Sequence, residues 1–167
     1  MRWRFQYIIN FLFFPNFLFQ MEARAFVNQL YEEYVIERTE TTGPIWYHLY
    51  GRSMCGKTFA AIEFSERFNF PIYVTHTHNT VLDTYYLQPD TKYFIIYSID
   101  KKKKCLDAFH RFVEKYMENI EIIIIETLES PRALFDFKTE QEERTYYRNV
   151  HVHNVEKEML KPLLNFE

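Results

Sequence analysis

The sequence predicts an α/β fold in which five strands, mainly parallel, form a sheet between helices. Several short apolar runs are continuous rather than alternating, which is typical of strands buried on both faces. Between these runs lie stretches whose apolar residues recur at three- and four-residue spacing, as in amphipathic helices. Strands that alternate with helices favour a parallel sheet with right-handed crossovers.

The composition is that of one folded domain. Of the 167 residues, 47% are hydrophobic and 19% aromatic, so a sizeable core is expected and disorder of the whole chain is excluded. The net charge of −3 means that any nucleic-acid binding must depend on a local basic patch. Cys55 and Cys105 show no CxxC or Cys/His spacing, which argues against a disulfide scaffold or zinc site and fits a reducing, intracellular compartment.

Residues 1–20 differ in composition from the rest. Their apolar run is interrupted by asparagines and Pro15, so it is too short and too broken for a comfortable membrane span, and no small-residue cleavage site follows. A membrane-associating lead and the end of an upstream domain remain alternatives. We interpret residues 1–20 as a lead outside the domain, with a true start at Met21 and a domain at 21–167.

An amphipathic helix is the first element expected within that domain. It covers residues 22–37, with apolar side chains toward the core and glutamates and Arg24 between them. The stretch 39–44 (TETTGP) breaks this helix. Residues 45–50 (IWYHLY) then form a buried strand.

The stretch 51–58 matches the phosphate-binding pattern G-x-x-x-x-G-K-[ST]. Glycines let successive backbone N–H groups turn toward phosphate oxygens, the lysine adds a charge, and the hydroxyl can hold Mg²⁺. Two of the chain's three glycines lie here, so we interpret the stretch as an ATP-binding loop; the alternative is a Gly-Lys surface turn. Its nucleotide-binding residues are Gly51, Arg52, Ser53, Met54, Cys55, Gly56, Lys57 and Thr58.

The remaining elements continue the alternation. A helix at 58–68 leaves the loop, and a helix built on Leu106, Phe109, Phe112, Val113, Tyr116 and Met117 follows later. Strands are expected at 72–75, 93–99, 120–125 and 147–153, with 47–50, 93–96 and 122–125 as the central buried segments. Residues 131–137 are interpreted as irregular, and 156–164 as a closing helix.

The order of these parts resembles a known family. The loop is followed by THTHNTVLD, KYFIIYSID, a helix, EIIIIETLESP and YYRNVHVH. This order resembles the superfamily 3 helicase ATPase module of replication initiator (Rep) proteins of small circular single-stranded DNA viruses, most like the nanovirus and alphasatellite branch. The resemblance covers about 47–153. It implies an AAA+-type sheet with the strand before the loop near its centre, an acid ending the third strand, and a polar sensor ending the fourth.

The sequence departs from that family at both strand ends. Ser98 stands at the position of the acid, with Asp100 two residues further on. Thr127, after Glu126, stands where the sensor is usually asparagine. The DNA-contacting hairpin is reduced to little more than the lysine run 101–104, for which a solvated face is the alternative to a phosphate contact.

The expected catalytic residues are Lys57, Asp100 and Glu126, and the expected Mg²⁺ site is Thr58 with Asp100. Phosphoryl transfer needs a metal held opposite the loop hydroxyl and a group that orients the attacking water, a role that Glu126 could fill. A helix N-cap is the alternative for Asp100, and a solvated strand end is the alternative for Glu126. We therefore expect any hydrolysis to be slow and to depend on these two carboxylates.

Arginines and histidines near the end of the chain admit further roles. Arg144 and Arg148 could reach into a neighbouring subunit as arginine fingers, or form surface ion pairs. His151 and His153 share one face of a predicted strand, as two metal ligands would, but Tyr146 and Tyr147 precede them instead of following. The pair at 76 and 78 lies in a predicted loop, and ordinary histidines are the alternative for both pairs.

Three functions therefore stay open. The resemblance implies a DNA-replication ATPase module that binds ATP with Mg²⁺, contacts single-stranded DNA, forms a homo-oligomer and works in the host nucleus or cytoplasm. A small nucleotide kinase has a similar length and the same loop, but it needs a lid rich in arginine. The stretch between Gly56 and Ile125 contains only two arginines, Arg67 and Arg111, which argues against such a lid there. The third possible function is that of a degenerate ATPase module that still binds nucleotide but does not hydrolyse it.

Overall fold

A parallel sheet of five strands organises the fold, in a computed structural model that describes residues 17–76, 86–99 and 103–164. Its strands are β1 (Ile45–Tyr50), β2 (Ile72–His76), β3 (Tyr93–Ser98), β4 (Ile120–Thr127) and β5 (Val150–Asn154). They lie in the order β2-β3-β4-β1-β5, and every neighbouring pair is parallel. The predicted α/β fold is confirmed, and β1, which precedes the loop, lies inside the sheet.

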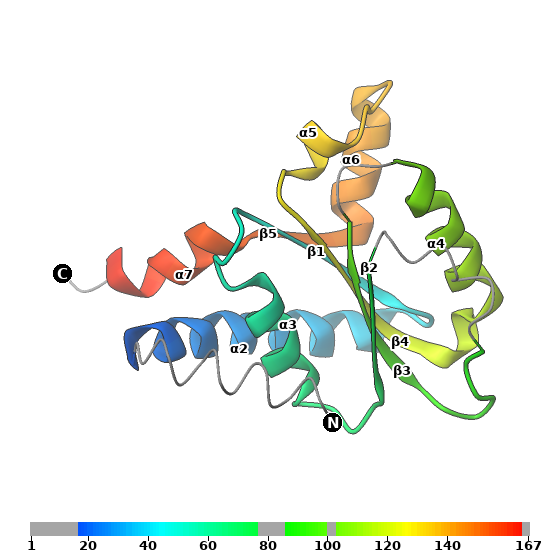
Figure 1. The fold of residues 1–167 in the computed structure, drawn as a ribbon, viewed down its shortest axis with the longest axis horizontal. Coiled ribbons are helices and arrows are strands. Elements are labelled where there is room, and N and C mark those ends of the chain that lie inside the picture. The colour runs from blue at the N-terminus through cyan, green and yellow to red at the C-terminus, as the bar shows by residue number, and fades with distance from the viewer. Residues whose placement is uncertain (1–16, 77–85, 100–102, 165–167) are drawn as a thin grey trace.

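Helices cover both faces of this sheet, as Figure 1 shows. They are α2 (Phe17–Glu40), α3 (Lys57–Ser65), α4 (Lys103–Lys115), α5 (Pro131–Leu134), α6 (Glu140–Asn149) and α7 (Val155–Leu164), with a 3₁₀ turn at Met117–Asn119. Side chains of α2, α3 and α7 share one buried cluster with the sheet, and those of α4 share another. Two covered faces explain why the predicted central segments 47–50, 93–96 and 122–125 have no polar side, and the structure confirms that they lie in the three interior strands.

Aromatic side chains fill much of the core on each face. Tyr97 of β3 stacks on Phe109 of α4 with ring centroids 4.0 Å apart. On the other face, Tyr47 of β1 meets Phe64 of α3 edge to face at 5.2 Å, and its hydroxyl donates a 2.7 Å hydrogen bond to the carbonyl of Leu30 in α2. These contacts hold β3 against α4, and β1 against α3 and α2.

Helix α2 is longer than the sequence pattern indicates. Helix α2 begins at Phe17 and ends at Glu40, so it crosses the expected domain boundary between residues 20 and 21. Arg38 in its last turn pairs with Glu121 of β4 at 2.8 Å, which fixes the end of the helix on the sheet. Within the described ranges, no helix is both long and apolar enough to cross a membrane.

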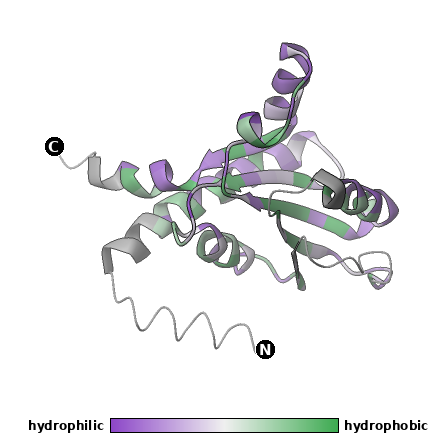
Figure 2. Cartoon of the chain, turned by 45° about the horizontal axis from the view of Figure 1, so that its top comes forward, coloured by the Kyte–Doolittle hydropathy of each residue, from purple (hydrophilic) through white to green (hydrophobic). Residues whose placement is uncertain are grey.

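The sequence interpretation is wrong in the segment that follows β4. Residues 131–137, expected to be irregular, begin with the short helix α5, and residues 147–149, expected in a strand, belong to α6. The Thr139 hydroxyl accepts a hydrogen bond from the Glu142 N–H, and glutamates in the first turn suit the positive end of the helix. Helix α6 is hydrophilic over most of its length (Figure 2), so apolar periodicity could not reveal it.

Candidate phosphate-binding site

Residues 51–58 connect the carboxyl end of β1 to the first turn of α3. The loop turns on itself through a 3.2 Å hydrogen bond from the Cys55 N–H to the Arg52 carbonyl. Gly56, at φ 103°, is the N-cap of α3, a backbone conformation that side chains with a Cβ disfavour. Gly51 lies at φ 154°, and a Cβ there would be 2.7 Å from the Cys55 sulfur. Two glycines of the motif are thus required by the shape of the loop.

The start of α3 is suited to an anion. Gly56 provides no side-chain cap, and the first turn of α3 carries no acidic residue. Uncapped N–H groups and the positive end of the helix dipole attract phosphate oxygens. The loop and the helix therefore present the backbone donors that the motif predicts.

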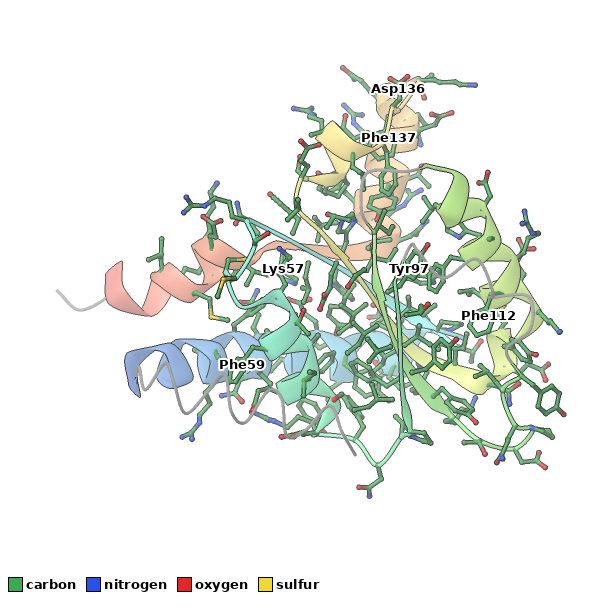
Figure 3. The ribbon with its side chains drawn as sticks, viewed as in Figure 1. Lys57, Phe59, Tyr97, Phe112, Asp136 and Phe137 are labelled. Atoms are coloured by element: carbon green, nitrogen blue, oxygen red, sulfur yellow. The ribbon has the colours of Figure 1, made fainter. Side chains whose placement is uncertain are left out.

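Lys57 lies where the loop enters α3 (Figure 3). Its ammonium group donates hydrogen bonds to the carbonyls of Gly51 at 2.5 Å and Arg52 at 3.0 Å. Both acceptors belong to the loop, so the side chain curls back across it. The charge of Lys57 is held at the loop, where the motif places it.

Thr58, the last residue of the motif, contacts a carboxylate of the sheet. The Thr58 hydroxyl donates a 2.9 Å hydrogen bond to the Glu126 carboxylate, and the Ser98 hydroxyl donates to the same oxygen at 3.0 Å. Glu126 is 4% exposed and lies beside Ser98 in the register of β3 and β4. The structure thus brings together the loop hydroxyl, the third strand and the predicted Glu126 carboxylate.

Asp100, the other predicted carboxylate, lies outside the described residues, as do Lys101 and Lys102. Strand β3 ends at Ser98, and its last side chain points at Glu126. Thr127, the residue aligned with the family's sensor, faces the opposite side of β4 from Glu126 because successive strand residues alternate.

Glu156 of α7 closes the outer rim of the loop. Its carboxylate accepts hydrogen bonds from the Arg52 backbone N–H at 2.9 Å and from the Arg52 guanidinium at 2.8 Å. These bonds to Arg52 lower the pKa of the Glu156 carboxyl. Burial raises the pKa of the Cys55 thiol above its ordinary value, which favours an inert thiol there.

A buried network that the sequence did not reveal lies on the other side of β1. His48 Nε2 lies 2.7 Å from the Thr127 hydroxyl, and Nδ1 lies 2.6 Å from the Tyr146 hydroxyl of α6. The Thr127 hydroxyl donates to the Glu129 carbonyl at 2.7 Å, so it accepts from an N–H at Nε2. The imidazole is then neutral, and burial lowers the pKa of His48 to about 3.

Three other residues singled out in the sequence, Arg144, His151 and His153, have surface or structural partners, whereas His78 lies outside the described residues. Arg144 pairs with Glu140 at 3.6 Å along α6. His151 contacts Glu33 and Glu37, and His153 contacts Glu33. These contacts join β5 to α2. Over residues 17–76, 86–99 and 103–164, no group of three or more His, Cys, Asp or Glu side chains is arranged to hold a metal ion.

A surface hollow of about 530 Å³ adjoins the end of β1. Tyr50, the residue before Gly51, lines it together with Tyr147, Ser130 and Arg132. Arg132 is paired with Glu143 at 2.7 Å, so its charge is balanced within the hollow. The hollow therefore presents aromatic and charged side chains at the end of the strand that leads into the loop.

The sheet, the loop between β1 and α3, and the position of Lys57 define an α/β protein of the P-loop class. No protein-family model and no curated protein matches the sequence. Among solved structures, the chain is similar to AMPPCP-bound DnaA from Aquifex aeolicus, with a TM-score of 0.46 and 14% identity. The match covers 82% of this chain and 51% of that one, so this chain spans about half of that DnaA chain.

Proposed function

We propose that the protein binds ATP, or a related nucleoside triphosphate, with Mg²⁺ at the loop 51–58, and hydrolyses it slowly. The observation that carries this proposal is the loop itself, which joins an interior parallel strand to an uncapped helix and holds the Lys57 ammonium against its own carbonyls. Phosphate oxygens would take the backbone N–H groups of the loop and the first turn of α3. The Lys57 ammonium would exchange its hydrogen bonds to the loop carbonyls for hydrogen bonds to the β- and γ-phosphates.

The side chains next to the loop fit a magnesium ion. Hard cations prefer oxygen ligands, and the Thr58 and Ser98 hydroxyls and the Glu126 carboxylate supply them within hydrogen-bond distance of one another. A cluster of three protein carboxylates is not required, because Mg²⁺ at such sites keeps waters and takes ligands from the phosphates. When bound, the ion would neutralise charge that develops on the phosphates during transfer.

A role in DNA replication is the biological setting that we propose. It follows from the resemblance of the sequence to the ATPase module of viral replication initiators, and it would make the protein an intracellular, oligomeric partner of single-stranded DNA. Arg144 is exposed and held by one long pair with Glu140, which leaves it accessible to the nucleotide of a neighbouring copy. The basic run 101–104 is the proposed DNA contact.

The test is nucleotide affinity of the wild type and of Lys57→Ala, measured by titration with a fluorescent ATP analogue. Lys57→Ala removes the charge opposite the outer phosphates, and we expect at least about a tenfold loss of affinity, since charge-assisted hydrogen bonds contribute about 1.5–3 kcal/mol. Lys138→Ala, an exposed lysine before α6, is the matched control and should bind as the wild type does. Equal affinity of wild type and a folded Lys57→Ala variant would refute nucleotide binding at the loop.

Phosphate release with and without single-stranded DNA then separates an ATPase from a binding protein. Wild type should release phosphate slowly, whereas Asp100→Asn and Glu126→Gln should each lower the rate at saturating nucleotide, and each variant should still bind nucleotide through the intact loop. A parent protein that binds ATP but releases no phosphate would identify a nucleotide-binding protein without hydrolysis.

A nucleotide kinase is the second candidate, and the hollow beside Tyr50 favours it. The hollow is lined by Tyr50, the residue that precedes the phosphate loop, and by Arg132 and Arg144, which a phosphorylated acceptor could recruit from their glutamates. A panel of nucleoside monophosphates offered with ATP tests this. Transfer of phosphate to one of them, lost in an Arg132→Ala variant, would favour the kinase over the ATPase.

A further inference from the structure

We propose that the carboxylate of the magnesium site comes from the fourth strand, as Glu126, and not from the end of the third. The inference rests on the proposed nucleotide binding and deepens it. The resemblance to viral ATPase modules implies an acid at Ser98 or shortly after it, which makes Asp100 the ligand expected from the sequence. The described structure instead points a different side chain at the loop hydroxyl.

The contact between Glu126 and Thr58 is the first argument. The Thr58 hydroxyl, which the motif assigns to the metal, already donates to a Glu126 oxygen at 2.9 Å. A cation placed there could be bound by a lone pair of the hydroxyl oxygen and by the carboxylate, with the hydroxyl proton turned away from the carboxylate. Glu126 therefore needs no rearrangement of the sheet to reach the site.

The chemistry of the neighbouring strand is the second argument. Ser98 is the register partner of Glu126, and its hydroxyl donates to the same oxygen at 3.0 Å. In the family pattern the third strand ends in the acid and the fourth in a neutral polar residue. Here the neutral hydroxyl of Ser98 ends β3 and the carboxylate of Glu126 lies at the end of β4. Ser98 also orients the Glu126 carboxylate toward Thr58, as groups behind a metal ligand commonly do.

Burial is the third argument. Glu126 is 4% exposed at the carboxyl edge of the sheet, with Leu49 of β1 beside it in the register. Burying a carboxylate costs free energy, so buried carboxylates are found where they are paired or bind a metal. The sensor position next to it, Thr127, has its hydroxyl engaged with His48 and Glu129 on the far side, so it does not compete for this place.

The experiment compares nucleotide affinity in EDTA with that in saturating Mg²⁺, using the same fluorescent ATP analogue. For the wild type we expect Mg²⁺ to tighten binding. In Glu126→Gln, which preserves shape and one acceptor oxygen, that increment should shrink by about tenfold or more, the scale on which ligand-shell changes weaken metal binding. Affinity in EDTA should remain within a few-fold of wild type, because the loop donors are intact.

Three further variants make the result specific. Glu126→Asp keeps the charge and should retain part of the Mg²⁺ increment. Ser98→Asp combined with Glu126→Gln moves the charge to the neighbouring strand and should restore part of it. Glu114→Gln, an exposed glutamate of α4, is the neutral control, and thermal unfolding checks that each variant is folded.

Retention of the full Mg²⁺ increment in folded Glu126→Gln, together with its loss in Asp100→Asn, would overturn the inference in favour of the third strand. An increment that is absent from the wild type would overturn it as well. A wild type that binds no nucleotide in either EDTA or Mg²⁺ would instead refute the proposed function, so the two failures are distinguishable.

Discussion

Protonation of His48 should destabilise the protein as the pH falls below about 6.5. The side chain is 0% exposed, and burial lowers its pKa from 6.5 to about 3. Its two nitrogens already serve as donor to Thr127 and acceptor from Tyr146, and a second proton would place two donors face to face at Nδ1. The native state therefore binds this proton less tightly than the unfolded chain does.

The sign and size of the effect follow from linkage. A depressed native pKa gives a contribution that is fully present above pH 6.5 and is lost progressively as the pH falls toward about 3. The slope is at most about 1.4 kcal/mol per pH unit, so the free energy of unfolding should fall by about 2 kcal/mol between pH 7 and pH 5. Other groups titrate in this interval, so the contribution of His48 must be isolated by comparison.

Urea unfolding of wild type and His48→Gln across that interval provides the comparison. Glutamine does not titrate and can still donate a hydrogen bond toward Thr127, so the variant should be less stable at pH 7 but should lose about 2 kcal/mol less on acidification. His110→Gln, an exposed histidine of α4, should keep the wild-type slope. Parallel curves for wild type and His48→Gln would refute the assignment of a buried neutral imidazole.

Two substitutions test the backbone and the core that hold the loop. Gly51→Ala forces a Cβ to 2.7 Å from the Cys55 sulfur and should weaken both nucleotide binding and thermal stability, whereas Gly43→Ala, also at positive φ but with open space, should cost stability alone. Tyr47→Phe removes the hydrogen bond from the Tyr47 hydroxyl to the Leu30 carbonyl and should lower the free energy of unfolding by about 1 kcal/mol in denaturant titration, against no change for exposed Tyr86→Phe. Unchanged affinity in Gly51→Ala, or unchanged stability in Tyr47→Phe, would contradict these contacts.

The sheet could be predicted because its signal is local. Segments such as 93–98 and 120–125 contain almost nothing but β-branched and aromatic residues, and only a strand covered on both faces accommodates such a run. The loop was predictable for a different reason, since its glycines are required by backbone angles that few other residues adopt. Neither inference needed contacts between distant residues.

Helix α6 and the networks around the loop could not be predicted because their signals are not local. Helix α6 is stabilised by the Thr139 cap and acidic first turn rather than by an apolar face, and β5 begins only after it. The contact of His48 with Tyr146 joins residues 98 positions apart, and that of Thr58 with Glu126 joins residues 68 apart. A sequence pattern gives the type of such side chains but not the face toward which each points.

The end of β4 joins these two networks through adjacent residues. Glu126 faces Thr58 of the loop, Thr127 faces His48 and through it Tyr146 of α6, and the Thr127 carbonyl accepts the Gly51 N–H at 3.2 Å. A cation bound by Glu126 would therefore lie next to the same short backbone segment that positions Thr127. The geometry thus connects the phosphate loop with α6, the helix that carries Arg144, through Thr127 and His48.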